Sequence, residues 1–151
     1  MFIHRPQNNA VRVLYATTYA NHGTTASEAA SATSYFAVIY NATVVSPADS
    51  EYNCHSYAWY STSSLNPYWM DNPNKYMTDG SYSGVSSPAI GDKITYKIGN
   101  TLDHSGIITG TGSTIYVTSK WGCAGVLRHT LTNNLYYMED YATNIQYWRA
   151  N

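Results

Sequence analysis

Apolar residues recur at three- and four-residue steps over the stretch from residue 26 to residue 40. They are Ala29, Ala32, Tyr35, Phe36 and Ile39. Steps of this size place apolar side chains on one face of a helix, which then packs inward. Just before them, Thr25 and Glu28 have the spacing of a capping box, in which a hydroxyl and a carboxylate bind the first free amides of a helix. We therefore predict a helix from about Ala26 to Tyr40.

A second helix is predicted directly after Asn53. Asparagine is one of the preferred N-cap residues of helices, and Tyr57 and Tyr60 follow at helical spacing. This helix begins at Cys54. Further upstream, Val11–Tyr15 alternates weakly between apolar and polar residues, which predicts a short strand or an extended arm.

The stretch from residue 61 to residue 88 is rich in Ser, Asn, Gly, Pro and Asp, and Tyr and Trp residues lie between them. This composition predicts a long loop, and long loops in compact domains are usually functional. After Pro88, alternation predicts strands at Lys93–Ile98, His104–Thr109, Thr114–Ser119 and Val126–Leu131. Gly110–Ser113 is expected to form a hairpin turn, and a short tail follows from Leu135.

Helical patterns early in the chain and strand patterns later predict an α+β fold, with N-terminal helices packed on an antiparallel β-meander. The length of 151 residues fits one domain. Within this single domain, 1–151, we expect residues 1–45 to form an N-terminal arm and helix to which the sequence assigns no role.

Composition narrows the class of partner. Eight Lys and Arg residues balance nine Asp and Glu residues, which argues against binding to nucleic acid or to an anionic membrane surface. Charged residues make up 11% of the chain, while Ser, Thr, Asn and 16 Tyr keep the surface polar without charge. We expect a secreted or cell-surface monomer with a neutral, polymeric or sugar-like partner. The sequence contains no apolar run of about 20 residues, the length needed for a membrane-spanning helix, so no membrane span is predicted.

Candidate chemistry centres on one of the two cysteines, Cys54 and Cys123. A thiol becomes a strong nucleophile when its pKa falls, and a helix N-terminus and a nearby imidazole both lower it. Cys54 has the first of these by position. His55 points about a quarter-turn away from its neighbour on the helix, which makes it the weakest candidate base. His104, at the start of a strand, is the preferred candidate, with His129 as another.

The hairpin predicts a partner for His104. If the turn is centred between Thr111 and Gly112, His104 lies directly opposite Ser119 on the same face of the sheet. Ser119 would then bind the ring nitrogen of His104 that is not used for catalysis.

Three blocks of residues carry a family resemblance. Cys54 at a helix start, residues 103–108 around His104, and Val117–Gly122 resemble the Cys, His and Asn-Ser-Trp-Gly blocks of papain-like cysteine hydrolases. In addition, Pro88–Tyr96 is similar to the Pro-x-x-Gly-Asp strand of NlpC-type and CHAP-type bacterial cell-wall hydrolases. The match covers roughly residues 52 to 129, and four blocks in the family's order are moderately specific.

This resemblance implies a papain-like fold and a thioester mechanism that cleaves amide bonds in peptidoglycan stem peptides or similar glycopeptides. Cys54 would be the nucleophile, and His104 the base and later the acid. Ser119 stands where papain-like enzymes carry Asn and where cell-wall relatives carry His, Glu, Asn or Asp. Because serine orients an imidazole less firmly, His129 and Asp103 stay open as the residue that completes the site.

An amide hydrolase also needs hydrogen-bond donors for the oxyanion. The backbone amide of Cys54 is one donor by geometry. The resemblance implies a tyrosine upstream of the nucleophile as the second, so Tyr52 is the first choice and Asn53 the second. Trp121, at the family's Trp position, would shield the inner hydrogen bond from water. No cofactor is expected, and no metal, because the zinc-ligand spacings Cys-x-x-Cys and His-x-x-x-His are absent from the sequence.

Other interpretations stay open. Flat aromatic rings stack on sugars and on peptide planes, so we expect a substrate groove that includes Tyr60, Tyr68, Trp69 and Trp121; equally, the aromatic residues of this loop cap the core. A second interpretation, motivated by serine at position 119, is a non-catalytic carbohydrate or cell-surface binding module that uses the aromatic loop and keeps the hydrolase fold as a scaffold. A third possibility is a transglutaminase-like acyltransferase. Cys54 is also compatible with a buried, unreactive role or a disulfide to Cys123.

Overall fold

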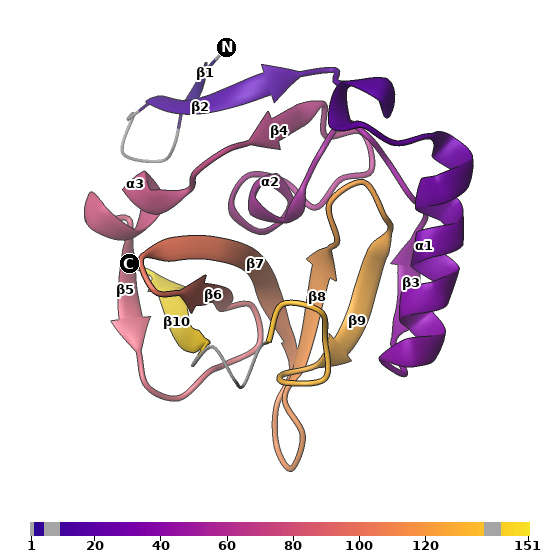
Figure 1. Cartoon of the computed structure of the whole chain (residues 1–151). Coiled ribbons are helices and arrows are strands. Elements are labelled where there is room, and N and C mark those ends of the chain that lie inside the picture. Colours follow the sequence, from indigo (N-terminus) through magenta and orange to yellow (C-terminus); the bar gives the residue numbers. More distant parts are fainter. Residues whose placement is uncertain (1, 5–9, 138–142) are drawn as a thin grey trace.

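The computed structural model describes residues 2–4, 10–137 and 143–151. In chain order its elements are β1 (Phe2–His4), β2 (Ala10–Tyr15), the 3₁₀ turn η1 (Ala20–His22), α1 (Ala26–Ile39), β3 (Thr43–Ser46), α2 (Cys54–Trp59), β4 (Tyr68–Met70), α3 (Asn74–Thr78), β5 (Tyr82–Val85), β6 (Lys93–Ile98), β7 (Thr101–Gly110), β8 (Tyr116–Lys120), β9 (Val126–Thr130) and β10 (Asn144–Ala150). The strands form a seven-stranded antiparallel sheet in the order β3-β9-β8-β7-β6-β10-β5 and a small sheet in the order β1-β2-β4 (Figure 1).

The predicted α+β fold, a papain-like domain with N-terminal helices packed on a β-meander, is wrong. The described chain is mostly β-sheet, and its first 45 residues contribute strands as well as the 14-residue α1. The stretch expected to be a long loop contains β4, α3 and β5. These elements are three to five residues long. Such short segments show no periodicity, and β4 and β5 are stabilised by pairing with the distant strands β2 and β10.

Both predicted helix starts are confirmed. The Thr25 side chain accepts a hydrogen bond from the backbone N–H of Glu28 at the start of α1. The Asn53 side chain likewise caps α2, which begins at Cys54. Figure 1 shows α2 between the small sheet and the ends of β7 and β8, whereas α1 lies along β3 at the other end of the large sheet.

The predicted pairing of His104 with Ser119 is wrong. Strands β7 and β8 pair Ile107 with Thr118, and the register shifts between Ile108 and Gly110. Continued toward the strand end, this register places Ser119 opposite Gly106, where a Cβ on that glycine would lie 3.3 Å from the Cβ of Ser119. The irregularity and the longer turn between the strands move the register by two residues relative to the tight hairpin.

The large sheet has an apolar cluster on each face. Ile94, Tyr96, Ile108 and Val117 form one cluster, and Tyr52, Tyr57 and Val126 pack with Ile107 of β7 in another. Because neighbouring residues of a strand point to opposite faces, His104 and Ser105 extend to opposite sides of β7. No helix among the described residues has the length and hydropathy needed to cross a membrane.

Candidate active site

Asn53 fixes the place where α2 begins. Its Oδ1 accepts hydrogen bonds from the backbone N–H groups of Ser56 and Met70, each at 3.1 Å. Its Nδ2 donates to the carbonyl of Met70 at 2.8 Å. The amide therefore joins the helix start to β4. Asn53 is already engaged in three structural bonds, so it is a poor candidate for the oxyanion donor expected from the sequence.

Cys54 is buried at the first position of α2. Burial raises the pKa of its thiol to about 11, although backbone hydrogen bonds from Ser105 and His55 act in the opposite direction. The sequence predicted a lowered pKa from the helix start, but loss of solvent outweighs it here. At neutral pH the side chain is a thiol and not a thiolate.

His104 is fully buried, and neither of its ring nitrogens has a hydrogen-bond partner among the described residues. The ring of Tyr136 stacks on it with a centroid separation of 3.5 Å and an interplanar angle of 2°. Burial, followed by the nearby His129 and His55, holds the pKa of His104 well below its usual range. The ring is therefore neutral, with both nitrogens unused.

The structure brings Cys54, His104 and Tyr136 into one buried region. The sulfur of Cys54 is hydrogen-bonded to the backbone of Ser105, the residue after His104. The pKa of the Tyr136 hydroxyl is raised well above its usual range by burial and then by the charges of Cys54 and Asp103. Asp103 itself is exposed at the strand irregularity.

Ser119 binds His129 and not His104. The Nδ1 of His129 lies 2.8 Å from the carbonyl of Thr130, which only accepts, so this nitrogen carries the proton. Nε2 is then an acceptor for the Ser119 hydroxyl at 2.9 Å. Trp121 Nε1 in turn donates to Ser119 Oγ at 3.0 Å. The result is a satisfied chain from Trp121 through Ser119 to His129, beside His104 but not bonded to it.

His55 belongs to a different hydrogen-bond group. Its Nδ1 lies 2.7 Å from the hydroxyl of Ser105, which also accepts from Trp59 Nε1. Burial lowers the pKa of His55 to about 4, so its ring is neutral at pH values near 7. This arrangement holds α2 against β7.

Lys120 supports the segment before Cys54. Its buried Nζ donates to the carbonyls of Asp49, Tyr52 and Gly122 at 2.6, 2.9 and 2.6 Å. It also lies 4.7 Å from the centroid of the Tyr52 ring. Tyr52 is thus buried in the core and bound through its carbonyl, on the side of the sheet that carries Lys120.

Two residues of this region were missed by the sequence analysis. Lys120 gave no signal for its burial, because it ends the strand Tyr116–Lys120 and a lysine in that place is usually exposed. Tyr136 gave no signal, because it reaches His104 from a loop. That loop is held by Asn134, whose Oδ1 accepts from the backbone N–H of Tyr136 at 3.0 Å.

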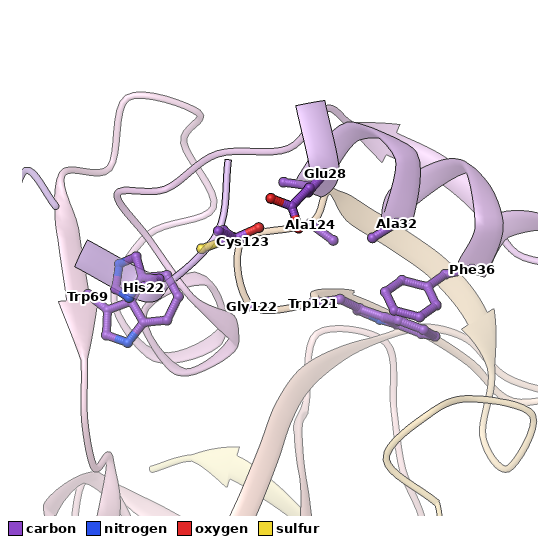
Figure 2. A pocket seen from close by; sticks show the side chains of 11 residues that line it. His22, Glu28, Ala32, Phe36, Trp69, Trp121, Gly122, Cys123 and Ala124 are labelled. Carbon is purple, nitrogen blue, oxygen red and sulfur yellow. The ribbon is translucent and has the colours of Figure 1, made fainter. Parts of the chain in front are cut away.

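The aromatic residues expected to line one groove divide into separate sets. Trp69 and Trp121 line the same groove (Figure 2). Tyr60 and Tyr68 instead form an aromatic cluster with Tyr15 at the surface. The centroid of the Tyr68 ring lies 5.3 Å from that of Tyr60 and 5.9 Å from that of Tyr15. The two cysteines are free, so no disulfide joins Cys54 to Cys123.

Comparison with known proteins gives no further guide. No protein-family model, no curated protein and no solved structure matches the chain. Within the described part of the chain, no group of three or more His, Cys, Asp or Glu side chains is arranged to hold a metal ion.

Proposed function

We propose that this protein is a thiol hydrolase of amide bonds, with Cys54 as the nucleophile and His104 as the general base. The observation that carries the proposal is a fully buried imidazole whose two nitrogens lack partners in the described chain. Its neighbour in sequence, Ser105, binds Cys54 at the start of α2 through its backbone, and Tyr136, which stacks on the imidazole, is also influenced by Cys54. An unbonded buried polar group destabilises a fold, and such groups often have a chemical role. Reaction with a substrate would use one of these nitrogens, first as a base and then as an acid.

The mechanism starts from two neutral groups. As the sulfur of Cys54 attacks a substrate carbonyl, His104 accepts the thiol proton, and the carbonyl oxygen becomes an oxyanion. The backbone N–H of Cys54 is the first donor to that oxygen, and Tyr52 is retained as a proposed second. His104 then gives its proton to the leaving amine as the C–N bond breaks, and a thioester remains.

Water completes the cycle. His104 accepts a proton from water, the resulting hydroxide attacks the thioester, and the proton returns to the sulfur of Cys54 as the acid product leaves. Because His104 has no exposed surface, substrate binding must displace a covering side chain. Tyr136 is half-buried and stacked on the ring, so we assign this covering role to it.

The substrate class we propose is the stem peptide of bacterial cell walls, on the basis of the motif resemblance around Cys54 and His104. The test is chromatography with mass spectrometry of purified muropeptides incubated with wild type, Cys54→Ala and His104→Phe. Cleavage by wild type and by the exposed control variant Tyr35→Ala, with none by the other two variants, is expected. Cleavage that survives Cys54→Ala would contradict the mechanism.

A second candidate, a carbohydrate-binding surface, is supported by the exposed aromatic cluster. Tyr15 and Tyr60 are 60% and 44% exposed, and both contact Tyr68. Exposed tyrosine rings stack readily on sugar faces. If this surface binds glycan, Cys54→Ala will sediment with purified peptidoglycan and Tyr60→Ala will weaken that binding, whereas Tyr35→Ala on α1 will not.

A further inference from the structure

A groove of about 430 Å³ lies beside Trp121, between α1 and the turn that carries Cys123. Figure 2 shows the stacked rings of His22 and Trp69 at one end, Phe36 and Trp121 at the other, and Glu28 and Cys123 between them. The groove is thus bounded by aromatic rings at both ends and has a carboxylate in the middle.

The end of the groove formed by His22 and Trp69 is held in place by stacking and hydrogen bonds. His22 stacks on Trp69 with centroids 3.8 Å apart and an interplanar angle of 22°. His22 Nε2 in turn lies 2.8 Å from the Thr17 hydroxyl and 3.2 Å from the carbonyl of Ser50. His22 therefore covers one face of the Trp69 ring and restricts its motion, so the ring needs little ordering when a ligand packs on it.

The charge of the groove is negative. Among its lining residues Glu28 is the single acid, and none is a lysine or an arginine. The Glu28 side chain is exposed, and its Oε1 accepts from the Thr25 hydroxyl at 3.1 Å. The other carboxylate oxygen has no bond among the described residues. An anionic ligand is disfavoured here, whereas an ammonium group gains both the carboxylate and the aromatic faces.

We propose that this groove binds a peptide segment that carries a protonated primary amine on a short aliphatic chain, as lysine does. The ammonium group pairs with Glu28, and the methylene groups pack on Trp69 and Phe36. The assignment of this segment to the hydrolase substrate rests on the proposed function. Trp121 links the two places, because it lines the groove and its ring centroid lies 5.4 Å from that of Tyr136, which covers His104.

Cys123 provides a reporter inside the groove. The chain has two cysteines, so Cys54→Ala leaves Cys123 as the single thiol, and its alkylation by iodoacetamide is followed by intact-protein mass spectrometry. The probe is the acetylated, amidated tripeptide Ala-Lys-Ala. It is compared with the same peptide acetylated on the lysine amine and with N-acetylglucosamine. Because this variant has no catalytic thiol, the result does not depend on hydrolysis.

The expected result is saturable protection of Cys123 by the lysine peptide and at least about tenfold weaker protection by the acetyl-lysine peptide. Glu28→Gln, which keeps the bond to Thr25 but removes the charge, should weaken protection by the lysine peptide to the same extent. Glu51→Gln, outside the groove, should not. Equal protection by both peptides, protection by the sugar alone, or no protection up to tens of millimolar would overturn the proposal. If muropeptide hydrolysis fails while protection is observed, the groove assignment stands without the enzyme.

Discussion

At the scale of single residues, His104 is the residue on which the proposed active site depends most. The other two buried histidines near it, His55 and His129, each have a hydrogen-bond partner. His104 has none in the described chain. A purely structural position would favour an apolar ring there, since replacing an unsatisfied polar group by an apolar group of similar shape is neutral or stabilising.

The substitution His104→Phe tests this distinction. It keeps a ring against Tyr136 and removes the two unbonded nitrogens, so the melting temperature should stay the same or rise. Hydrolysis should fall by about 10³-fold, the range of a lost general base. The matched variant His129→Phe removes the acceptor of the Ser119 hydroxyl and a donor to the Thr130 carbonyl, and it should cost roughly 2 kcal/mol of unfolding free energy. Equal destabilisation by both variants would contradict a special role for His104.

The two cysteines should differ in reactivity. Cys54 is buried with a pKa of about 11, whereas Cys123 is half-buried in the groove. Iodoacetamide should therefore modify Cys123 first at pH values up to about 9, and Cys54 should react only as the pH approaches its own pKa. Peptide mass spectrometry across this pH range provides the measurement. Rapid alkylation of Cys54 in weak acid would instead indicate a preformed thiolate and imidazolium pair.

At the scale of elements, Lys120 connects β8 to the two segments that frame the site. Its ammonium group binds carbonyls from the chain before α2 and from the turn after β8. Burial lowers its pKa to about 8, so the group is still largely protonated at neutral pH. Lys120 therefore fixes the segment before α2 to β8, and through its bond to the Tyr52 carbonyl it helps to position Cys54.

Lys120→Met should leave three carbonyls without their donor. We expect a loss of roughly 3 kcal/mol in the free energy of unfolding, measured by urea titration, with a parallel fall in hydrolysis because the Tyr52 carbonyl is released. Lys97→Met on β6 serves as the control and should change stability by less than about 1 kcal/mol. A stable, fully active Lys120→Met protein would show that these bonds are dispensable.

The sequence predicted those elements whose signals are local. The caps Thr25 and Asn53 act within four residues, and strict alternation identified β6. The pairing of His104 and Ser119 was wrong, because register depends on turn length and on an irregularity that no pattern reveals. The contact of Tyr136 with His104 depends on the folded loop, and so could not be predicted.

At the scale of the whole molecule, the interior holds several neutral histidines. Burial lowers the pKa of His55 and His129 to about 4, and it holds the pKa of His104 well below its usual range. The unfolded chain binds protons on these rings near pH 6.5, whereas the folded chain does not. The contribution of these histidines to the free energy of unfolding is therefore fully present above about pH 6.5. It is lost as the pH falls toward 4.

This linkage predicts marked acid sensitivity. Each of His55 and His129 should contribute a loss on the order of 3 kcal/mol between about pH 6.5 and pH 4. Urea unfolding at several pH values measures the slope. His55→Asn keeps an acceptor near Ser105 but has no group that titrates in this range, so its slope should be shallower than that of wild type. A stability that does not change over this range would contradict neutral, buried rings.

The central claim is that Cys54 forms a thioester after His104 takes its proton. The most direct measurement is mass spectrometry of the protein quenched in acid during muropeptide turnover, followed by mapping of the modified peptide. We predict an acyl adduct on Cys54 in wild type and none in His104→Phe. Turnover without an adduct on Cys54, or an adduct that forms equally well in His104→Phe, would contradict the claim.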